Sequence, residues 1–294
     1  MIETARRLGS LLAFSLALVA SAAAEIRPAR VVSINMCTDQ LLIDLAEPGQ
    51  IAGLSPYARD ATRSWFAQQA RTLPVLSGTA EEIVLIRPDL VLSGRFSRRA
   101  TQAFIKERRI RVAEFDPART LAEARDQIIR MGELLGASDK ARQRAEQLDA
   151  ALDRLKNAAA RSPIRILPLS RRGWIAGRDS LLSDILASGG LTNAAGAGLA
   201  EGGFLPLERI VLLQPDALVL TRDDDVAEDQ GRAMVLHPAL LHLFPPERRI
   251  VLPEYLTVCS GPMLAEAMDR LARQIGGLTP RRVERSNGAP AGKF

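Results

Sequence analysis

The sequence predicts an α/β protein of two similar lobes, each built on a parallel sheet, joined by a long backbone helix. Three observations lead to this prediction. One helix–strand segment occurs twice, short apolar strands alternate with helices in both halves, and a long amphipathic helix separates the halves. Because two like lobes usually form a cleft, we expect a ligand cleft between them.

The repeated segment comprises residues 81–92 and residues 208–219. Each copy begins with a glutamate, continues as a short apolar helix to a Pro-Asp pair, and ends in a run rich in Leu and Val. Proline ends the helix before it, and aspartate favours a turn. The last run is too short for a helix, and its apolar character is typical of a buried parallel strand.

The first half of the chain alternates strands and helices in the order that is typical of a parallel sheet. A turn at 35–38 is expected between the first strand and the first helix. The expected strands are 31–34, 51–54, 90–92 and 111–115, and further helices are expected at 39–46 and 103–109.

Two helices are expected in the centre of the chain. Gly136 ends the first, residues 121–135. Ser138 can cap the second, residues 139–160, which would be roughly 33 Å long. This second helix could cover a sheet, but its length and central position favour a strut between the lobes. Its apolar stripe is formed by Ala141, Ala145, Leu148, Leu152 and Leu155.

The second half returns to the strand–helix alternation. Pro262 suits the first turn of the closing helix, where its missing N–H costs nothing. Besides the second repeat, the expected elements are strands at 164–169 and 250–252, helices at 180–187 and 262–275, and a glycine-rich loop at 189–203.

Residues 1–24 are predicted to be a signal peptide. Arg6 and Arg7 precede an apolar core at 11–20, and three alanines at 22–24 offer a cleavage site. The residues after the two arginines match a twin-arginine signal poorly, which favours the general secretory route. The remaining boundaries are an N-terminal lobe at 25–137, the backbone helix at 138–161, a C-terminal lobe at 162–279 and a disordered tail at 280–294.

The composition offers little catalytic chemistry. The net charge of +5 comes from dispersed arginines without a basic block, which argues against nucleic acid as a partner. His237 and His242 are separated by Pro238, so they cannot form the paired ligands of a metal-binding helix. No nucleophile elbow, Cys-x-x-Cys pair or phosphate-binding loop is present in the sequence. The sequence therefore indicates no catalytic residue, no metal site and no resident cofactor.

Several segments, in this order and at these distances, resemble one known family. They are VVSI at 31–34, the first repeat at 81–92, MGELLG at 131–136, GWIAG at 173–177, LSDIL at 182–186 and GGLTN at 189–193. Together they resemble the periplasmic substrate-binding proteins of the helical-backbone class, which serve ABC importers of ferric siderophores, cobalamin and haem. The resemblance implies a monomer in the periplasm that binds a metal chelate and docks on an ABC permease of the inner membrane.

The resemblance also implies a role for Glu81 and Glu208. In this family one glutamate in each lobe, placed before the Pro-Asp segment, docks on arginines of the permease. Such charges steer docking more than they add affinity. An acidic residue also stabilises the N-terminus of its own helix, and the two roles are compatible.

The expected topology predicts the ligand-binding residues. In an open parallel sheet, ligands bind outside the carboxyl ends of the strands. Aromatic side chains at these ends could face a planar ligand, and arginines there would suit an anionic one. The predicted residues are Asn35, Cys37, Tyr57, Arg95, Arg171, Arg172, Trp174, Tyr255 and Cys259.

Cys37 and Cys259 are the only cysteines, and we expect them to face the cleft from opposite lobes. A disulfide would pin the lobes together, and it requires Cα atoms within about 7 Å. Free thiols beside helix N-termini could instead ligate a soft metal. The disulfide is the favoured interpretation for an exported chain, although the sequence leaves the thiol state open.

The predicted function is therefore the capture of a metal chelate, without catalysis, for delivery to an ABC importer. Ferric siderophore and cobalamin are the leading ligands. Haem is less favoured because no histidine is expected in the cleft, although Tyr57 could ligate iron. Two other classes stay open: a periplasmic sensor that reports ligand to a membrane partner, and an exported redox or metal-dependent enzyme that uses the two cysteines.

Overall fold

The computed structural model describes residues 27–95, 97, 99–196, 201–221 and 230–280. The predicted signal peptide lies outside these residues, and so does the predicted tail beyond residue 280. Within these ranges, no helix combines the length and the hydropathy that a membrane span requires.

The N-terminal lobe contains a parallel sheet with the strand order β2-β1-β3-β4. Its strands are β1 (Val31–Ser33), β2 (Ile51–Gly53), β3 (Leu90–Gly94) and β4 (Val112–Phe115). Its helices are α1 (Met36–Leu45), α2 (Ala80–Ile86), α3 (Arg99–Glu107) and α4 (Leu121–Leu135), with 3-10 turns η1 (Pro48–Gln50), η2 (Pro56–Arg59) and η3 (Gln69–Thr72).

Side chains of this sheet alternate between two buried clusters, so helices cover both of its faces. Val31 and Leu92 pack with residues of α1 and α4. Val32 and Val91 pack instead with residues of α2 and α3. This alternation follows from the period of two residues along a strand.

The C-terminal lobe repeats the arrangement with the strand order β10-β9-β5-β7, again parallel. Its strands are β5 (Arg165–Leu169), β7 (Thr192–Asn193), β9 (Ala217–Leu220) and β10 (Arg249–Val251), and an antiparallel pair is formed by β6 (Trp174–Ile175) and β8 (Gly203–Phe204). Its helices are α6 (Leu181–Ser188), α7 (Leu207–Leu213), α8 (Gln230–Val235), α9 (Pro238–Leu243) and α10 (Met263–Ile275), with 3-10 turns η4 (Arg171–Gly173), η6 (Pro246–Arg248) and η7 (Glu254–Leu256). The predicted α/β fold of two similar lobes is confirmed.

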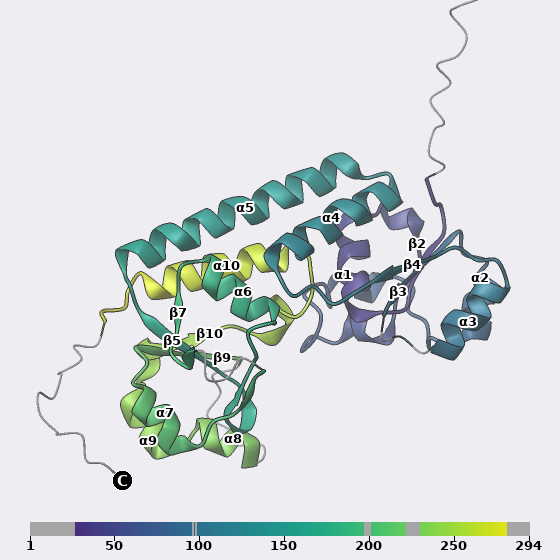
Figure 1. Cartoon of the computed structure of the whole chain (residues 1–294). Helices are drawn as coiled ribbons and strands as arrows, with labels where there is room; N and C mark the ends of the chain where they lie inside the picture. The colour runs from purple at the N-terminus through teal and green to yellow at the C-terminus, as the bar shows by residue number, and fades with distance from the viewer. Residues whose placement is uncertain (1–26, 96, 98, 197–200, 222–229, 281–294) are drawn as a thin grey trace, which may run out of the picture.

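Helix α5 (Ser138–Arg161) runs along one side of both lobes, and α4 and α10 pack against it (Figure 1). Its 24 residues make it about 36 Å long. Small side chains allow the close approach, because a Cβ added at Gly132 of α4 would lie 2.3 Å from the Cβ of Ala141. The fully buried residues Ala145 and Leu155 continue the apolar stripe.

Two arginines of α5 hold it to helices on either side. The Arg144 guanidinium donates to both carboxylate oxygens of Asp44 on α1, at 2.8–3.1 Å. Arg154 binds both oxygens of Asp269 on α10, at 2.7 and 2.9 Å. Paired arginine–carboxylate contacts fix orientation as well as distance. The backbone helix is therefore fixed by side-chain contacts to the N-terminal lobe and to α10.

The two copies of the sequence repeat adopt the same local structure. Arg87 is the C-cap of α2 and Gln214 is the C-cap of α7, and both residues have the left-handed backbone conformation, with φ of 52° and 46°. A non-glycine residue with this conformation is uncommon. In each copy the Pro-Asp pair follows directly and leads into the central strands β3 and β9.

The aspartate of each copy also fixes the neighbouring strand. Asp89 Oδ2 accepts a hydrogen bond from the backbone N–H of Arg30, at 2.9 Å, just before β1. Asp216 Oδ2 accepts one from the N–H of Arg165, at 2.7 Å, at the start of β5. Each aspartate also donates its own N–H to the carbonyl of the same arginine. The Pro-Asp pair therefore sets strand register in addition to ending the helix.

Several predicted helix boundaries are wrong. Helix α3 begins at Arg99, four residues before the predicted start, and Pro262 is the N-cap of α10 rather than part of its first turn. The residues 35–38 do not form a separate turn, because α1 begins at Met36 with Asn35 as its N-cap. Ser138 does not cap α5, because Ala137 occupies the N-cap position and Ser138 is the first helical residue. In contrast, α4 has the predicted limits, with Gly136 in the left-handed conformation that follows many helices.

We expect Gly132→Ala to lower the free energy of unfolding by about 1–2 kcal/mol. The added methyl group would overlap Ala141, and this cost outweighs the better helix propensity of alanine. Unfolding in urea measures the effect. The matched variant Gly132→Ala with Ala141→Gly should recover stability relative to the sum of the two single variants. Simple additivity of the two changes would show that the two helices are not in contact as described.

Candidate ligand-binding site

Asn35 starts α1 at the carboxyl end of β1. Its Oδ1 accepts hydrogen bonds from the backbone N–H groups of Cys37, at 2.9 Å, and Thr38, at 3.3 Å. Gly94 at the end of β3 leaves room for this side chain, because a Cβ there would lie 2.4 Å from Asn35 Nδ2. Asn35 is therefore an N-cap, the role that its residue type favours.

A pocket of about 560 Å³ opens beside Asn35, at the carboxyl edge of the N-terminal sheet. Tyr57 in η2 lines it with 48% of its surface exposed, and the Arg63 guanidinium carbon lies 5.3 Å from the centre of the Tyr57 ring. The pocket thus offers an aromatic ring, a cation and several hydroxyl groups. The hydroxyl groups come from Ser55, Ser77, Ser97 and Thr101.

Asp39 lies buried next to this pocket, in α1. Its Oδ2 accepts a hydrogen bond from the hydroxyl of Ser55 at 2.5 Å, and its Oδ1 accepts one from the Ser55 N–H at 3.1 Å. Burial raises the pKa of Asp39 to about 7, and the hydrogen bonds from Ser33 and Ser55 only partly offset this effect. Since Ser55 lines the pocket, the protonation of Asp39 is coupled to a residue of the pocket wall.

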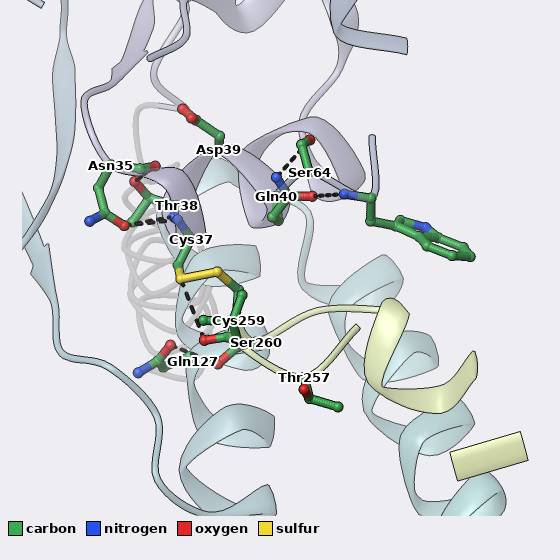
Figure 2. The surroundings of a disulfide bond; sticks show 12 residues. Asn35, Cys37, Thr38, Asp39, Gln40, Ser64, Gln127, Thr257, Cys259 and Ser260 are labelled. Carbon is green, nitrogen blue, oxygen red and sulfur yellow. Dashed lines mark hydrogen bonds between the residues drawn. A yellow bond between two sulfur atoms is a disulfide. The ribbon is translucent and has the colours of Figure 1, made fainter. Parts of the chain in front are cut away.

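Cys37 and Cys259 form a disulfide, which joins the first turn of α1 to the loop before α10 (Figure 2). Their Cα atoms are 5.0 Å apart. The next residue of the same loop, Ser260, donates a hydrogen bond to Gln127 Oε1 on α4, at 2.9 Å. The structure thus contains the disulfide rather than two free thiols, and sulfur atoms bonded to each other are not thiolate ligands.

A second contact joins the N-terminal lobe to the segment after β10. Gln40 is buried in α1, donates to Ser64 Oγ at 2.9 Å and accepts from the Trp65 N–H at 3.1 Å (Figure 2). These bonds hold the loop that presents the Trp65 ring. Its centre lies 6.2 Å from that of Tyr255 in η7. The predicted ligand residue Tyr255 therefore packs against an aromatic residue of the other lobe.

The C-terminal lobe presents an exposed aromatic pair. Trp174 of β6 and Phe204 of β8 are paired in the antiparallel ladder, and their ring centres are 5.0 Å apart in an edge-to-face arrangement. The exposed fractions are 39% and 61%. Just before β6, Arg172 has a φ of 59°, and it lines a pocket of about 670 Å³ together with Phe204 and Glu208.

The remaining predicted residues lie elsewhere. Arg95 is 3.7 Å from Asp116 and lines a third pocket of about 540 Å³ at the edge of β4. Arg171 belongs to the same 3-10 turn as Arg172. Glu81 and Glu208 are exposed in the first turns of α2 and α7. Within the described ranges, no group of three or more His, Cys, Asp or Glu side chains could hold a metal ion.

Four of the nine predicted ligand residues line a pocket, and these four divide among three pockets; the five that line none of the three are Cys37, Arg171, Trp174, Tyr255 and Cys259. Asn35 and Tyr57 share the pocket of the N-terminal lobe, Arg172 lines that of the C-terminal lobe and Arg95 lines the third. Sequence reasoning missed Arg63 and Phe204. Arg63 lies in an irregular segment without a period to read, whereas the aromatic character of Phe204 beside a glycine-rich loop was an available signal.

Comparison with known proteins identifies the family. The sequence profile of the periplasmic binding proteins matches residues 31–242. The chain belongs to this family. Its members are binding proteins of the periplasm. A search of curated proteins found no match.

Solved structures of periplasmic binding proteins have the same fold. The haem-binding protein RhuT from Roseiflexus sp. RS-1 is 24% identical, with a TM-score of 0.68, over 84% of this chain and 97% of that one. The vitamin B12-binding protein BtuF of Vibrio cholerae is 15% identical, with a TM-score of 0.61, over 84% and 96%. A protein of an Fe3+-hydroxamate transport system from Saccharomonospora viridis is 20% identical, with a TM-score of 0.61, over 85% and 94%.

We expect the loss of the disulfide to destabilise this periplasmic binding protein strongly. The bond joins cysteines 222 residues apart. For such a loop the chain-entropy description gives about 5 kcal/mol, and losses of native disulfides are typically about 2–5 kcal/mol. Unfolding of Cys37→Ser with Cys259→Ser in urea measures the difference. Dithiothreitol should destabilise the wild-type protein but leave the double variant unchanged, and a double variant as stable as wild type would contradict the expectation.

The raised pKa of Asp39 predicts a dependence of stability on pH. The folded value of about 7 exceeds the unfolded value of 3.8, so the folded protein binds the extra proton between these values. This contribution is present below pH 3.8 and is lost as the pH rises through 7. Between pH 5 and pH 8 the wild type should lose on the order of 2 kcal/mol more stability than Asp39→Asn.

Urea unfolding at both pH values provides the measurement. Asp60→Asn is a suitable control because hydrogen bonds from Thr62 lower the pKa of this exposed carboxyl group, so its effect on the pH dependence should not resemble that of Asp39. Parallel curves for wild type and Asp39→Asn would contradict the assignment.

Proposed function

We propose that this chain captures a metal chelate, a ferric siderophore or cobalamin, in the periplasm and delivers it as a monomer to an ABC importer of the inner membrane. The pocket beside Tyr57 carries the proposal. It lies at the carboxyl edge of a parallel sheet, where ligands bind in open α/β folds. Its volume of about 560 Å³ is in the range of small-molecule sites.

The lining of this pocket supports a polar chelate. Siderophores and cobalamin carry many amide or hydroxamate groups, and the hydroxyl groups of Ser55, Ser77 and Thr101 can both donate and accept hydrogen bonds. Arg63 adds a positive charge for an anionic complex. Tyr57 supplies an exposed ring against which an apolar part of the ligand can pack.

Haem is the second candidate, and Tyr57 is the observation that favours it. A tyrosine oxygen can ligate haem iron. His237, in contrast, lines the pocket of the C-terminal lobe, and its Nδ1 accepts a hydrogen bond from the N–H of Ala239 at 3.2 Å. Haem would therefore depend on Tyr57 rather than on this histidine. The similarity to a haem-binding protein from Roseiflexus supports retaining this candidate.

Delivery to a permease is supported by the two glutamates. Glu81 and Glu208 are exposed at equivalent positions of the two lobes. Among the described residues, neither carboxylate has an ion pair or a side-chain hydrogen bond. They are thus available to arginines of a partner. The disulfide weakens the alternative of an exported redox enzyme, because that reaction would require free thiols.

The test is a titration of the purified chain without residues 1–24, using ferrichrome, cyanocobalamin and haemin. We expect saturable binding of one chelate, followed by tryptophan fluorescence. A ligand at 100 times its Kd should stabilise the protein by about 2.7 kcal/mol, which raises Tm measurably. If none of these chelates bound or raised Tm, the proposed capture of a chelate would be wrong for all three ligand classes.

Tyr57 variants separate the candidates. For a siderophore or cobalamin we expect Tyr57→Phe to retain affinity and Tyr57→Ala to lose about tenfold, because packing on the ring is lost. For haem, Tyr57→Phe alone should abolish the tyrosine-ligated absorption spectrum. Phe104→Ala is the matched control, because Phe104 lies beneath Arg108 at 4.7 Å on the surface of α3, outside the pocket. A Tyr57→Ala variant with wild-type affinity would place the ligand elsewhere.

A further inference from the structure

Two leucines are far more exposed than apolar side chains usually are. Leu85 is 82% exposed and Leu212 is 72% exposed, the highest values for large apolar residues in the described part of the chain. A single exposed leucine needs no explanation. These two, however, occupy the same position in the two copies of the repeat, four residues after Glu81 and Glu208.

The spacing places each leucine on the same helix face as its glutamate, one turn away. The opposite face is buried, since Ile83 and Ile210 have no exposed surface and pack under their sheets. Both lobes therefore present one exposed glutamate and one exposed leucine side by side. We call these two pairs the lobe epitopes: Glu81 with Leu85, and Glu208 with Leu212.

Glu81 differs from the adjacent Glu82 in the hydrogen bonds of its carboxylate. Glu82 is occupied locally, because its Oε2 accepts hydrogen bonds from the N–H and the hydroxyl of Ser77, at 2.7 and 2.6 Å. Glu81 makes no such bond among the described residues. In the second lobe the position of Glu82 is taken by Arg209, so the exposed side chains that α2 and α7 share are the glutamate and leucine of the epitope.

The lobe epitopes lie on helices that precede the central strands. Helix α2 leads into β3 and α7 leads into β9, so the N-terminal ends of both helices lie at the carboxyl edges of their sheets. The pockets open at the same edges: Ser77 lines the pocket of the N-terminal lobe, and Glu208 lines that of the C-terminal lobe. The two helices belong to lobes on opposite sides of the molecule (Figure 1).

We propose that Leu85 and Leu212 are the apolar anchors of these epitopes, which together fit a partner that presents one surface twice. That surface would present a basic group that pairs with the glutamate and an apolar pocket that binds the leucine. A two-fold symmetric protein supplies such a pair of surfaces. The inference rests on the proposed function, in which the partner is the importer permease, and adds an apolar contact to the charged one.

The charged and the apolar contact of each epitope contribute differently to docking. The glutamates govern the approach of the partner and its dependence on salt. A leucine that leaves water on binding gains free energy in proportion to its buried area, and this gain does not depend on salt. The glutamate beside each leucine also disfavours an anionic lipid surface as the occupant, because like charges repel.

The test measures docking on the importer permease of the cell that produces this chain, purified in nanodiscs of uncharged lipid. We expect Leu85→Ser and Leu212→Ser each to weaken docking about tenfold, mostly through faster dissociation, and the double variant to lose about a hundredfold. The dependence of docking on salt should be unchanged in these variants, whereas Glu81→Gln should reduce it. Leu241→Ser, at a 40% exposed leucine on α9 outside the repeat, is the matched control.

The outcomes separate the two proposals. Wild-type docking that the double leucine variant fully retains would overturn the role of the leucines and leave the delivery function intact. A wild-type protein that does not dock at all would overturn delivery, and the leucine anchors with it. Because both leucines are exposed, Tm of the variants should equal that of wild type, which excludes misfolding as the cause of any loss.

A photoreactive amino acid at position 85 or 212 identifies the occupant in living cells. Crosslinks to the permease support the proposal. Crosslinks to lipid alone, or to a second copy of this chain alone, would overturn it, since either would mean that the leucines serve another contact. Crosslinking at position 241 provides the background.

Discussion

The close contact of α5 with α4 and α10 determines how the two lobes are held. It is possible only because the facing residues are small, with Gly132 against Ala141 and further alanines along the stripe. One buried apolar cluster then extends without interruption from Val31 of β1 to Ile250 of β10. Since a packed core resists deformation, the lobes are placed by burial rather than by a flexible linker. A binding surface fixed in this way loses little conformational entropy when a ligand arrives.

Both lobes use the same Pro-Asp pair to position their central strands. In each lobe, the aspartate after the proline accepts a hydrogen bond from a backbone N–H at the start of the neighbouring strand. These bonds hold the central strands of both sheets in register. The side chains near the ends of these strands differ between the two lobes. The N-terminal lobe presents Tyr57 and hydroxyl groups, and the C-terminal lobe presents Trp174 with Phe204. A common scaffold that carries different binding loops is frequent among proteins, because loops tolerate sequence change better than the strands and helices that hold them.

The sequence predicted the framework because periodicity and breakers are local signals. The helix at 121–135 was predicted to the residue, since Gly136 ends it in a conformation that glycine adopts easily. The cap of α1 was missed, because the pattern did not show that the Asn35 side chain would bind the N–H groups of Cys37 and Thr38. Arg63 was missed for a different reason: its position over Tyr57 depends on tertiary structure. The residues of the site, unlike the strands, are brought together by loops that have no period.

The disulfide has a consequence for the biogenesis of the protein. Cys259 is synthesised 222 residues after Cys37, when both sheets and α5 are already complete. If the chain follows the general secretory route that residues 1–24 predict, Cys37 enters an oxidising compartment before its partner, as an unpaired thiol. Closure of the bond is then a late event, and it can occur only once the segment after β10 has reached α1. The disulfide is therefore present only in chains that extend beyond Cys259, and a chain truncated before that residue would carry Cys37 as a free thiol open to mispairing.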